Sequence, residues 1–219
     1  MQTNDGRLII VSGASRSGKT AWVRQQTKAA RRVLVWDIEA QWCELPGYRK
    51  ITSRAELYAA IQSDKPARLA YVAGGADLKD EFNFWAACVM LWGRYRGGCV
   101  AIAEELADVS TPAKAPQEWG ILLRRGLKRG ITIYAISQRW AEADKTAIGN
   151  ASEFVVFRAA GDDVRYMSQK ARVPVADLEE LRPEYWDTEC KRLKRGPFIR
   201  ATVTGTVTRG EISFPRPRG

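Results

Sequence analysis

The sequence predicts an α/β fold in which helices flank a mostly parallel β-sheet. Short apolar runs typical of buried strands alternate with helical stretches over most of the 219 residues, and this alternation is typical of βαβ units. A glycine-rich loop joins the first apolar run to the first helical stretch, the position that such loops take in α/β folds. Residues 1–219 are expected to form a single domain, in which residues 191–219 form a basic C-terminal hairpin and tail.

The predicted elements follow one another closely along the chain. Strands are expected at residues 8–12, 33–36, 69–72, 99–103, 131–137 and 154–157. Helices are expected at residues 20–26, 53–63, 80–95, 117–128, 163–171 and 175–181. The second helix opens with a capping box that runs from Ser53 to Glu56. The third is rich in aromatic residues, which are expected to pack in the core.

The end of the chain has a different pattern. Residues 198–203 and 206–208 flank Gly205 and predict a hairpin, with residues 211–214 as a strand extension and a mobile basic tail after them. Four cations precede the hairpin, at Lys191, Arg192, Lys194 and Arg195. A solvated charged loop is one interpretation of them, and contact with a binding partner such as DNA is the other.

The loop between the first strand and the first helix matches the phosphate-binding pattern G-x-x-x-x-G-K-[ST] in full. It consists of Gly13, Ala14, Ser15, Arg16, Ser17, Gly18, Lys19 and Thr20. Glycines let such a loop wrap around a phosphate, and backbone N–H groups at the helix N-terminus face the anion. Lys19 is expected to reach the β and γ phosphates of ATP, and the Thr20 hydroxyl is expected on Mg²⁺. A chance Gly/Ser-rich turn is the alternative, and the flanking strand and helix argue against it.

The composition of the chain limits the catalytic groups it can use and indicates the kind of partner it binds. Lys and Arg number 35 against 25 Asp and Glu, a net charge of +10 that suggests a polyanionic partner such as nucleic acid. The chain has no His, which excludes imidazole bases and Ser–His–Asp triads. Its four Cys lie far apart with no C-x-x-C motif, so they are interpreted as reduced thiols. The apolar runs are too short for an integral membrane segment and no signal peptide is visible, so a soluble intracellular protein is expected.

An acidic pair ends the strand predicted at 99–103. A carboxylate at this position beside a phosphate-binding loop can hold Mg²⁺ through water, and a second can polarise the attacking water as a general base. We assign Glu104 to the metal and Glu105 to the water. Two solvated acids at the start of a loop are the alternative.

Polar and basic residues near the strand at 131–137 are further candidates. Gln138 follows that strand and is placed to sense the γ-phosphate or to orient water. Arg124, Arg125 and Arg129 precede it. Three interpretations of these arginines stay open: a solvated helix end, an arginine finger offered to a neighbouring subunit, and a DNA-backbone contact.

Together these motifs resemble the FtsK/HerA superfamily of DNA-pumping ATPases, and within it the genome-packaging ATPases of membrane-containing, tectivirus-type icosahedral phages. The segments that carry the resemblance are 13–20, 35–37, 101–108 and 136–139, with 125–131 and 149–151 in support. Two departures from the family pattern stand out. Glu104 replaces the Asp that is usual in the family, and Leu127 occupies a position where the family often has Arg.

The resemblance implies a RecA-like core in which the strand before Gln138 lies between the strand before the P-loop and the acidic strand. It also implies a homo-oligomeric ring, a hexamer, with active sites between subunits. Double-stranded DNA would pass through the ring into a preformed capsid at one vertex, in the host cytoplasm or on the virion. Under this resemblance, the four cations at 191–195 would contact DNA or the capsid vertex. Three rival functions are a filamentous-phage assembly ATPase of the zonula-occludens-toxin type, a small-molecule P-loop kinase and a non-catalytic minor virion protein.

Overall fold

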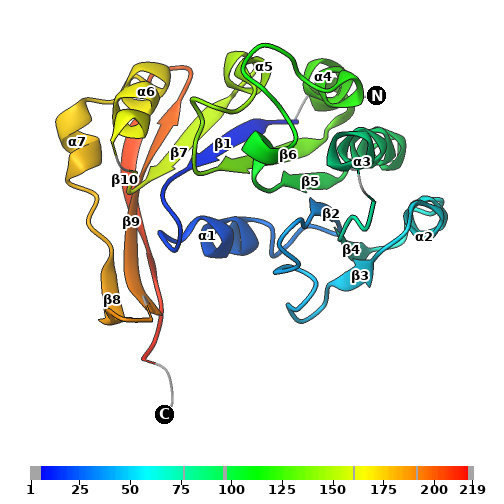
Figure 1. Ribbon diagram of the computed structural model, residues 1–219, viewed down its shortest axis with the longest axis horizontal. Coiled ribbons are helices and arrows are strands. Elements are labelled where there is room, and N and C mark those ends of the chain that lie inside the picture. Colours follow the sequence, from blue (N-terminus) through cyan, green and yellow to red (C-terminus); the bar gives the residue numbers. More distant parts are fainter. Residues whose placement is uncertain (1–5, 76, 96–97, 160, 191, 217–219) are drawn as a thin grey trace.

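The computed structural model describes residues 6–75, 77–95, 98–159, 161–190 and 192–216, and a ten-stranded sheet runs through them (Figure 1). In spatial order its strands are β10 (Val207–Ser213), β9 (Arg192–Thr202), β7 (Glu153–Phe157), β1 (Leu8–Ser12), β6 (Thr132–Ser137), β5 (Val100–Ala103), β2 (Arg32–Trp36), β4 (Ala67–Tyr71) and β3 (Arg49–Ile51), while β8 (Glu184–Asp187) pairs with β9. Neighbouring strands from β7 to β3 are parallel, and β8, β9 and β10 are antiparallel. The predicted mostly parallel sheet is confirmed.

Helices cover both faces of the sheet. One face packs against α1 (Lys19–Gln26), and the other against α2 (Arg54–Ala60), α3 (Leu78–Trp92), α4 (Gln117–Ile121) and α5 (Lys145–Gly149) (Figure 1). Within β1, Ile9 and Val11 pack in the α1 cluster, whereas Leu8 and Ile10 pack in the opposite one. Because side chains alternate along a strand, a sheet covered on both faces needs continuous apolar strands.

The aromatic residues of α3 pack in the core as expected. Trp85 stacks on Phe82 with ring centroids 5.2 Å apart, and Trp36 meets Phe82 edge-on at 5.3 Å. The helix begins two residues before the predicted start, because the Asp77 carboxylate accepts hydrogen bonds from the backbone N–H groups of residues 79 and 80. It ends at Trp92, before the predicted end at 95, and position 97 lies outside the described residues.

Several elements differ from the sequence prediction. The strands β3 and β8 and the helix α5 were not predicted, and residues 117–128 form α4, then a π-helical turn η2 (Leu122–Gly126), then the 3₁₀ turn η3 (Leu127–Arg129). A short 3₁₀ turn, η1 (Leu106–Asp108), follows the acidic pair. The two last helices, α6 (Asp162–Ala171) and α7 (Val175–Glu179), lie close to their predicted positions and contribute Val164, Met167 and Leu178 to the α3 side of the core.

The C-terminal hairpin is longer than predicted and belongs to the main sheet, because β9 pairs with β7 over five residue pairs. Of the basic stretch, residues 192–195 are the start of β9 and not the loop of the first interpretation. Lys194 bonds Glu184, and Arg195 bonds Glu184 and Glu211. Position 191 and the end of the tail, 217–219, lie outside the described residues.

The strand order positions the site. β6 lies between β1 and β5, as the family resemblance implies. Because these strands are parallel, their carboxyl ends meet at one edge, which brings the P-loop, Gln138 and the acidic pair together. No helix within the described residues is long and apolar enough to cross a bilayer.

Candidate nucleotide-binding site

The P-loop is held in shape by its backbone and by the strands beside it. Its start is fixed where the Ala14 N–H donates to the Arg158 carbonyl at 2.7 Å. Gly18 has φ 113, and an added Cβ there would lie 3.0 Å from Ile212 and 3.2 Å from Leu193. Only glycine fits this conformation and this space without strain. The Ser17 hydroxyl is buried and has no partner among the described residues, so it is a donor that a bound phosphate can satisfy.

Lys19 lies inside the loop. Its Nζ donates to the carbonyl oxygens of Gly13 and Ala14 at 2.8 and 2.9 Å, and the residue is 8% exposed. Burial lowers the pKa of Lys19 to about 8, although the charges of Glu105 and Glu104 act in the opposite direction. A poorly hydrated cation at a helix N-terminus attracts a phosphate strongly.

Thr20 and Glu104 form an oxygen pair at the next position. The Thr20 hydroxyl donates to Glu104 Oε1 at 3.1 Å, and Glu104 is almost fully buried. Burial raises the pKa of Glu104, while the hydrogen bond from Thr20 and the charge of Lys19 oppose this rise. No cluster of three or more acidic or Cys residues able to hold a metal occurs in the described part of the chain. One hydroxyl and one carboxylate suit Mg²⁺, which keeps several waters and takes other ligands from phosphates.

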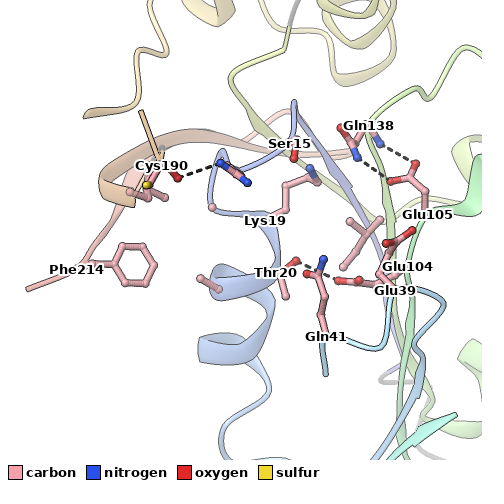
Figure 2. A pocket seen from close by; sticks show the side chains of 15 residues that line it. Ser15, Lys19, Thr20, Glu39, Gln41, Glu104, Glu105, Gln138, Cys190 and Phe214 are labelled. Carbon is pink, nitrogen blue, oxygen red and sulfur yellow. Dashed lines mark hydrogen bonds between the residues drawn. The ribbon is translucent and has the colours of Figure 1, made fainter. Parts of the chain in front are cut away.

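Glu105 is fixed by the end of β6. Its backbone adopts a left-handed conformation, with φ 46 and ψ 60. Its carboxylate accepts a hydrogen bond from the Ser137 hydroxyl at 3.1 Å. It also accepts from the Gln138 backbone and side-chain amides at 3.3 Å each (Figure 2). The structure therefore joins Glu105 and Gln138 directly, which their separation in the sequence does not reveal.

One cavity of about 590 Å³ connects these groups. Its lining includes Lys19 and Thr20 at the centre and the two glutamates with Gln138 on one side (Figure 2). Further lining residues that sequence reasoning missed are Glu39, Gln41, Cys190, Leu193 and Phe214. None of these five residues belongs to a motif that marks it as part of a nucleotide site.

Asp37 explains how two of the missed residues reach the cavity. Its carboxylate is fully buried and accepts from the backbone N–H groups of Gln41, Trp42 and Cys43 at 2.9, 3.1 and 2.8 Å. These bonds fold the loop after β2 against the site and bring Glu39 and Gln41 into the lining. The buried acid at the end of β2 thus has a structural role.

The basic candidates lie elsewhere in the chain. Arg124 and Arg125 are exposed on η2, and Arg129 on η3 donates to the Met90 carbonyl at 3.4 Å. The turn η3 leads into β6 at its amino end, whereas Gln138 follows the carboxyl end, so these arginines are absent from the cavity of their own chain. Their position shows that they do not act on the cavity of their own chain.

The fold and the cavity together define a protein with the P-loop NTPase fold. No family model matches the chain. The chain is 28% identical over 189 residues to Protein P9 of Pseudoalteromonas phage PM2, which covers 81% of this chain and 83% of the relative.

Solved structures show the same fold over nearly the whole chain. The genome packaging NTPase B204 of Sulfolobus turreted icosahedral virus 2, in complex with AMPPCP, has a TM-score of 0.72, 13% identity and coverage of 98% of this chain and 100% of that chain. B204 of Sulfolobus turreted icosahedral virus, a DNA-packaging ATPase, has a TM-score of 0.66, 13% identity and coverage of 99% and 100%. The resemblance to viral genome-packaging ATPases that the motifs indicate is therefore present in the fold as well.

Proposed function

We propose that this protein is an ATP hydrolase that packages double-stranded viral DNA into a preformed capsid. The observation that carries the proposal is the single cavity that joins the P-loop lysine, the Thr20–Glu104 pair and the Glu105–Gln138 pair. The likeness of the whole chain to B204, a genome packaging NTPase, supports the packaging role.

In this proposal the loop from Gly13 to Thr20 holds the triphosphate of ATP. Lys19 leaves the Gly13 and Ala14 carbonyls for the β and γ phosphates, and the buried Ser17 hydroxyl donates to a phosphate oxygen. Thr20 and Glu104 would hold hydrated Mg²⁺, whose charge would neutralise the phosphate oxygens.

Glu105 acts as the general base for the attacking water. Its carboxylate is aimed by Ser137 and by both amides of Gln138, and the same Gln138 side chain is positioned to detect the γ-phosphate. Phosphoryl transfer depends mainly on positioning and charge neutralisation, so a base with a fixed orientation suits the reaction.

The remaining parts of the proposal concern the assembly. We propose a homo-oligomeric ring, a hexamer of the FtsK/HerA type, in which Arg124, Arg125 or Arg129 of one subunit completes the site of its neighbour. Their position outside the cavity of their own chain supports action in trans. The ring would act in the host cytoplasm at a unique capsid vertex, contacting vertex proteins and DNA phosphates. We further propose that residues 1–219 are one ATPase domain, since a single sheet joins both ends of the described chain.

The test is ATP hydrolysis by Glu105→Gln, measured as phosphate release with and without double-stranded DNA and with no phosphoryl acceptor added. We expect turnover to fall by about 100-fold or more, the usual contribution of a general base, with ATP binding retained. Glu179→Gln, the same change on α7 away from the cavity, should keep wild-type turnover. Undiminished hydrolysis by Glu105→Gln would remove Glu105 from the mechanism, and a wild-type protein without phosphate release would contradict the function itself.

A further inference from the structure

The cavity continues past the P-loop, away from the carboxylates. On this side it is lined by Cys190, Leu193 and Phe214, which belong to the C-terminal strands and the segments next to them. Figure 2 shows Phe214 and Cys190 on one side of α1 and Glu104 and Glu105 on the other. The cavity therefore has an acidic end, a cationic centre at Lys19 and a largely apolar end.

The backbone of Phe214 is held in place by hydrogen bonds on both of its polar groups. The Phe214 N–H donates to the Lys194 carbonyl at 2.9 Å, and the Phe214 carbonyl accepts from Trp186 Nε1 at 3.2 Å. Trp186 is itself covered by the Lys194 ammonium, whose Nζ lies 5.0 Å from the ring centroid. Bonds to β8 and β9 thus fix the backbone of Phe214, which follows β10 and lines the cavity.

The same strands pack directly on the phosphate-binding loop. A Cβ at Gly196 of β9 would lie 2.6 Å from the Ser17 carbonyl oxygen, so only glycine allows this approach. Arg16 of the loop donates to the Cys190 carbonyl at 2.9 Å. The apolar end of the cavity is therefore attached to the part that would bind phosphate.

We propose that Phe214, with Leu193, forms the nucleobase subsite of this protein; the inference rests on the proposed binding of a nucleoside triphosphate. With the γ-phosphate directed toward Glu105, the base of the nucleotide extends to the opposite end of the cavity, against the Phe214 ring. Aromatic rings bind bases by stacking, and stacking tolerates every base.

At the apolar end of the cavity, the backbone N–H and carbonyl groups of Cys190 and Phe214 already bond to other groups of the protein. The Cys190 N–H donates to Asp187 at 3.0 Å and its carbonyl accepts from Arg16, while both backbone groups of Phe214 are bonded to β8 and β9. The side chains of Phe214 and Leu193 therefore provide the apolar contacts to the base. ATP and GTP should consequently bind with similar affinity.

The test compares the affinities of ATP, GTP and inorganic tripolyphosphate for the full chain and its variants, measured by calorimetry. In Phe214→Ala we expect ATP and GTP to bind about tenfold or more weakly, the scale of a lost base–aromatic stack, with tripolyphosphate affinity unchanged. Phe214→Trp should retain nucleotide affinity, and Val203→Ala, at the exposed turn of the hairpin, should behave as wild type. Equal loss for all three ligands, or no loss for ATP, would overturn the subsite.

A second measurement needs no variant. Cys190 is exposed, whereas Cys88 and Cys99 are buried, so mass spectrometry can follow alkylation of Cys190 by iodoacetamide in the wild-type chain. ATP should slow this reaction severalfold more than tripolyphosphate does, and equal protection would contradict the proposal. Both measurements report binding, so a protein that binds ATP at Phe214 but releases no phosphate would refute the hydrolase and leave the subsite standing.

Discussion

At the scale of single residues, the site combines an unusual backbone with a buried cation. Glu105 is one of the described non-glycine residues with positive φ, a conformation that costs about 1–2 kcal/mol in an ordinary residue. Three hydrogen bonds to Ser137 and Gln138 offset this cost and leave the carboxylate in one orientation. Backbone strain held by neighbouring groups is typical of functional positions.

The lowered pKa of Lys19 predicts a pH dependence of nucleotide binding. Burial places this pKa near 8, and a bound triphosphate favours the charged form, so binding above pH 8 must take up a proton. We expect the Kd for ATP to be flat from pH 6.5 to 7.5 and to rise by up to about tenfold per pH unit above pH 8. Calorimetry in two buffers of different ionisation heat measures the proton uptake directly. A flat Kd up to pH 9.5 without proton uptake would contradict this interpretation.

The lowered pKa of Lys19 also determines how the free energy of unfolding depends on pH. Because the folded state releases the Lys19 proton near pH 8 and the unfolded state near 10.5, the unfolded chain binds more protons between these values. The contribution of Lys19 to the free energy of unfolding therefore increases as the pH rises through this window.

At the scale of secondary structure, the decisive contact is the pairing of β9 with β7, which joins the C-terminal strands to the parallel sheet. Arg200 on β9 makes two bonds to Glu153 on β7, at 2.6 and 2.8 Å. The Glu153 side chain is only 5% exposed, whereas that of Arg200 is 43% exposed. This ion pair thus supports the strand that positions Leu193 and the rest of the apolar wall.

Removing Arg200 should destabilise the fold. In Arg200→Ala the Glu153 carboxylate stays buried without its partner, and we expect a loss of about 1–3 kcal/mol in the free energy of unfolding, less than for a fully buried pair because Arg200 is partly exposed. Urea denaturation measures the loss. Arg209→Ala is the matched control, since Arg209 pairs with Asp177 and Glu180 at the surface and should change stability little. Equal effects of the two changes would show that burial of Glu153 is unimportant.

At the scale of the whole molecule, the chain presents its nucleotide site at one edge of the sheet and its exposed arginines at the other. The cavity lies at the carboxyl ends of β1, β5 and β6, while η2 and η3 precede the amino end of β6. In the proposed ring, the edge of one subunit that carries the arginines can lie against the edge of its neighbour that carries the nucleotide site. The net charge of +10 also suits a ring that encloses DNA.

Subunit mixing tests whether the arginines act in trans. Lys19→Ala subunits and subunits with Arg124, Arg125 and Arg129 all changed to Ala should each be nearly inactive, because a trans arginine contributes about 10³-fold or more to turnover. Mixed together, they should recover hydrolysis, since some interfaces combine an intact Lys19 with an intact arginine. Phosphate release after mixing is the measurement.

A control mixture distinguishes damage to the cavity of a subunit from loss of an arginine supplied by its neighbour. Lys19→Ala mixed with Glu105→Gln should stay inactive, because both changes damage the cavity of their own chain. Full activity of the arginine variant alone, or no recovery in the first mixture, would exclude these three arginines as the trans finger.

The sequence by itself determined the local elements of the site. The P-loop could be located because its spacing of glycine, lysine and threonine lies between an apolar run and a helical stretch, as phosphate binding requires. The strands at 8–12, 33–36 and 131–137 could be located because doubly covered strands are continuously apolar. The placement of β6 between β1 and β5 followed from the family resemblance and is confirmed. The helix at 80–95 was recognised, but its start was misplaced because Asp77, and not Asp80, is the N-cap.

Only the tertiary structure decided the other half of the cavity. Phe214, Leu193 and Cys190 lie far from the P-loop in the chain and reach it because β9 pairs with β7, a contact that no local pattern records. The strands β3 and β8 are short and partly exposed, so they lack the apolar alternation that marks a strand. Local spacing specifies groups that act within a few residues of each other, whereas pairing between distant strands depends on the free energy of the whole packed sheet.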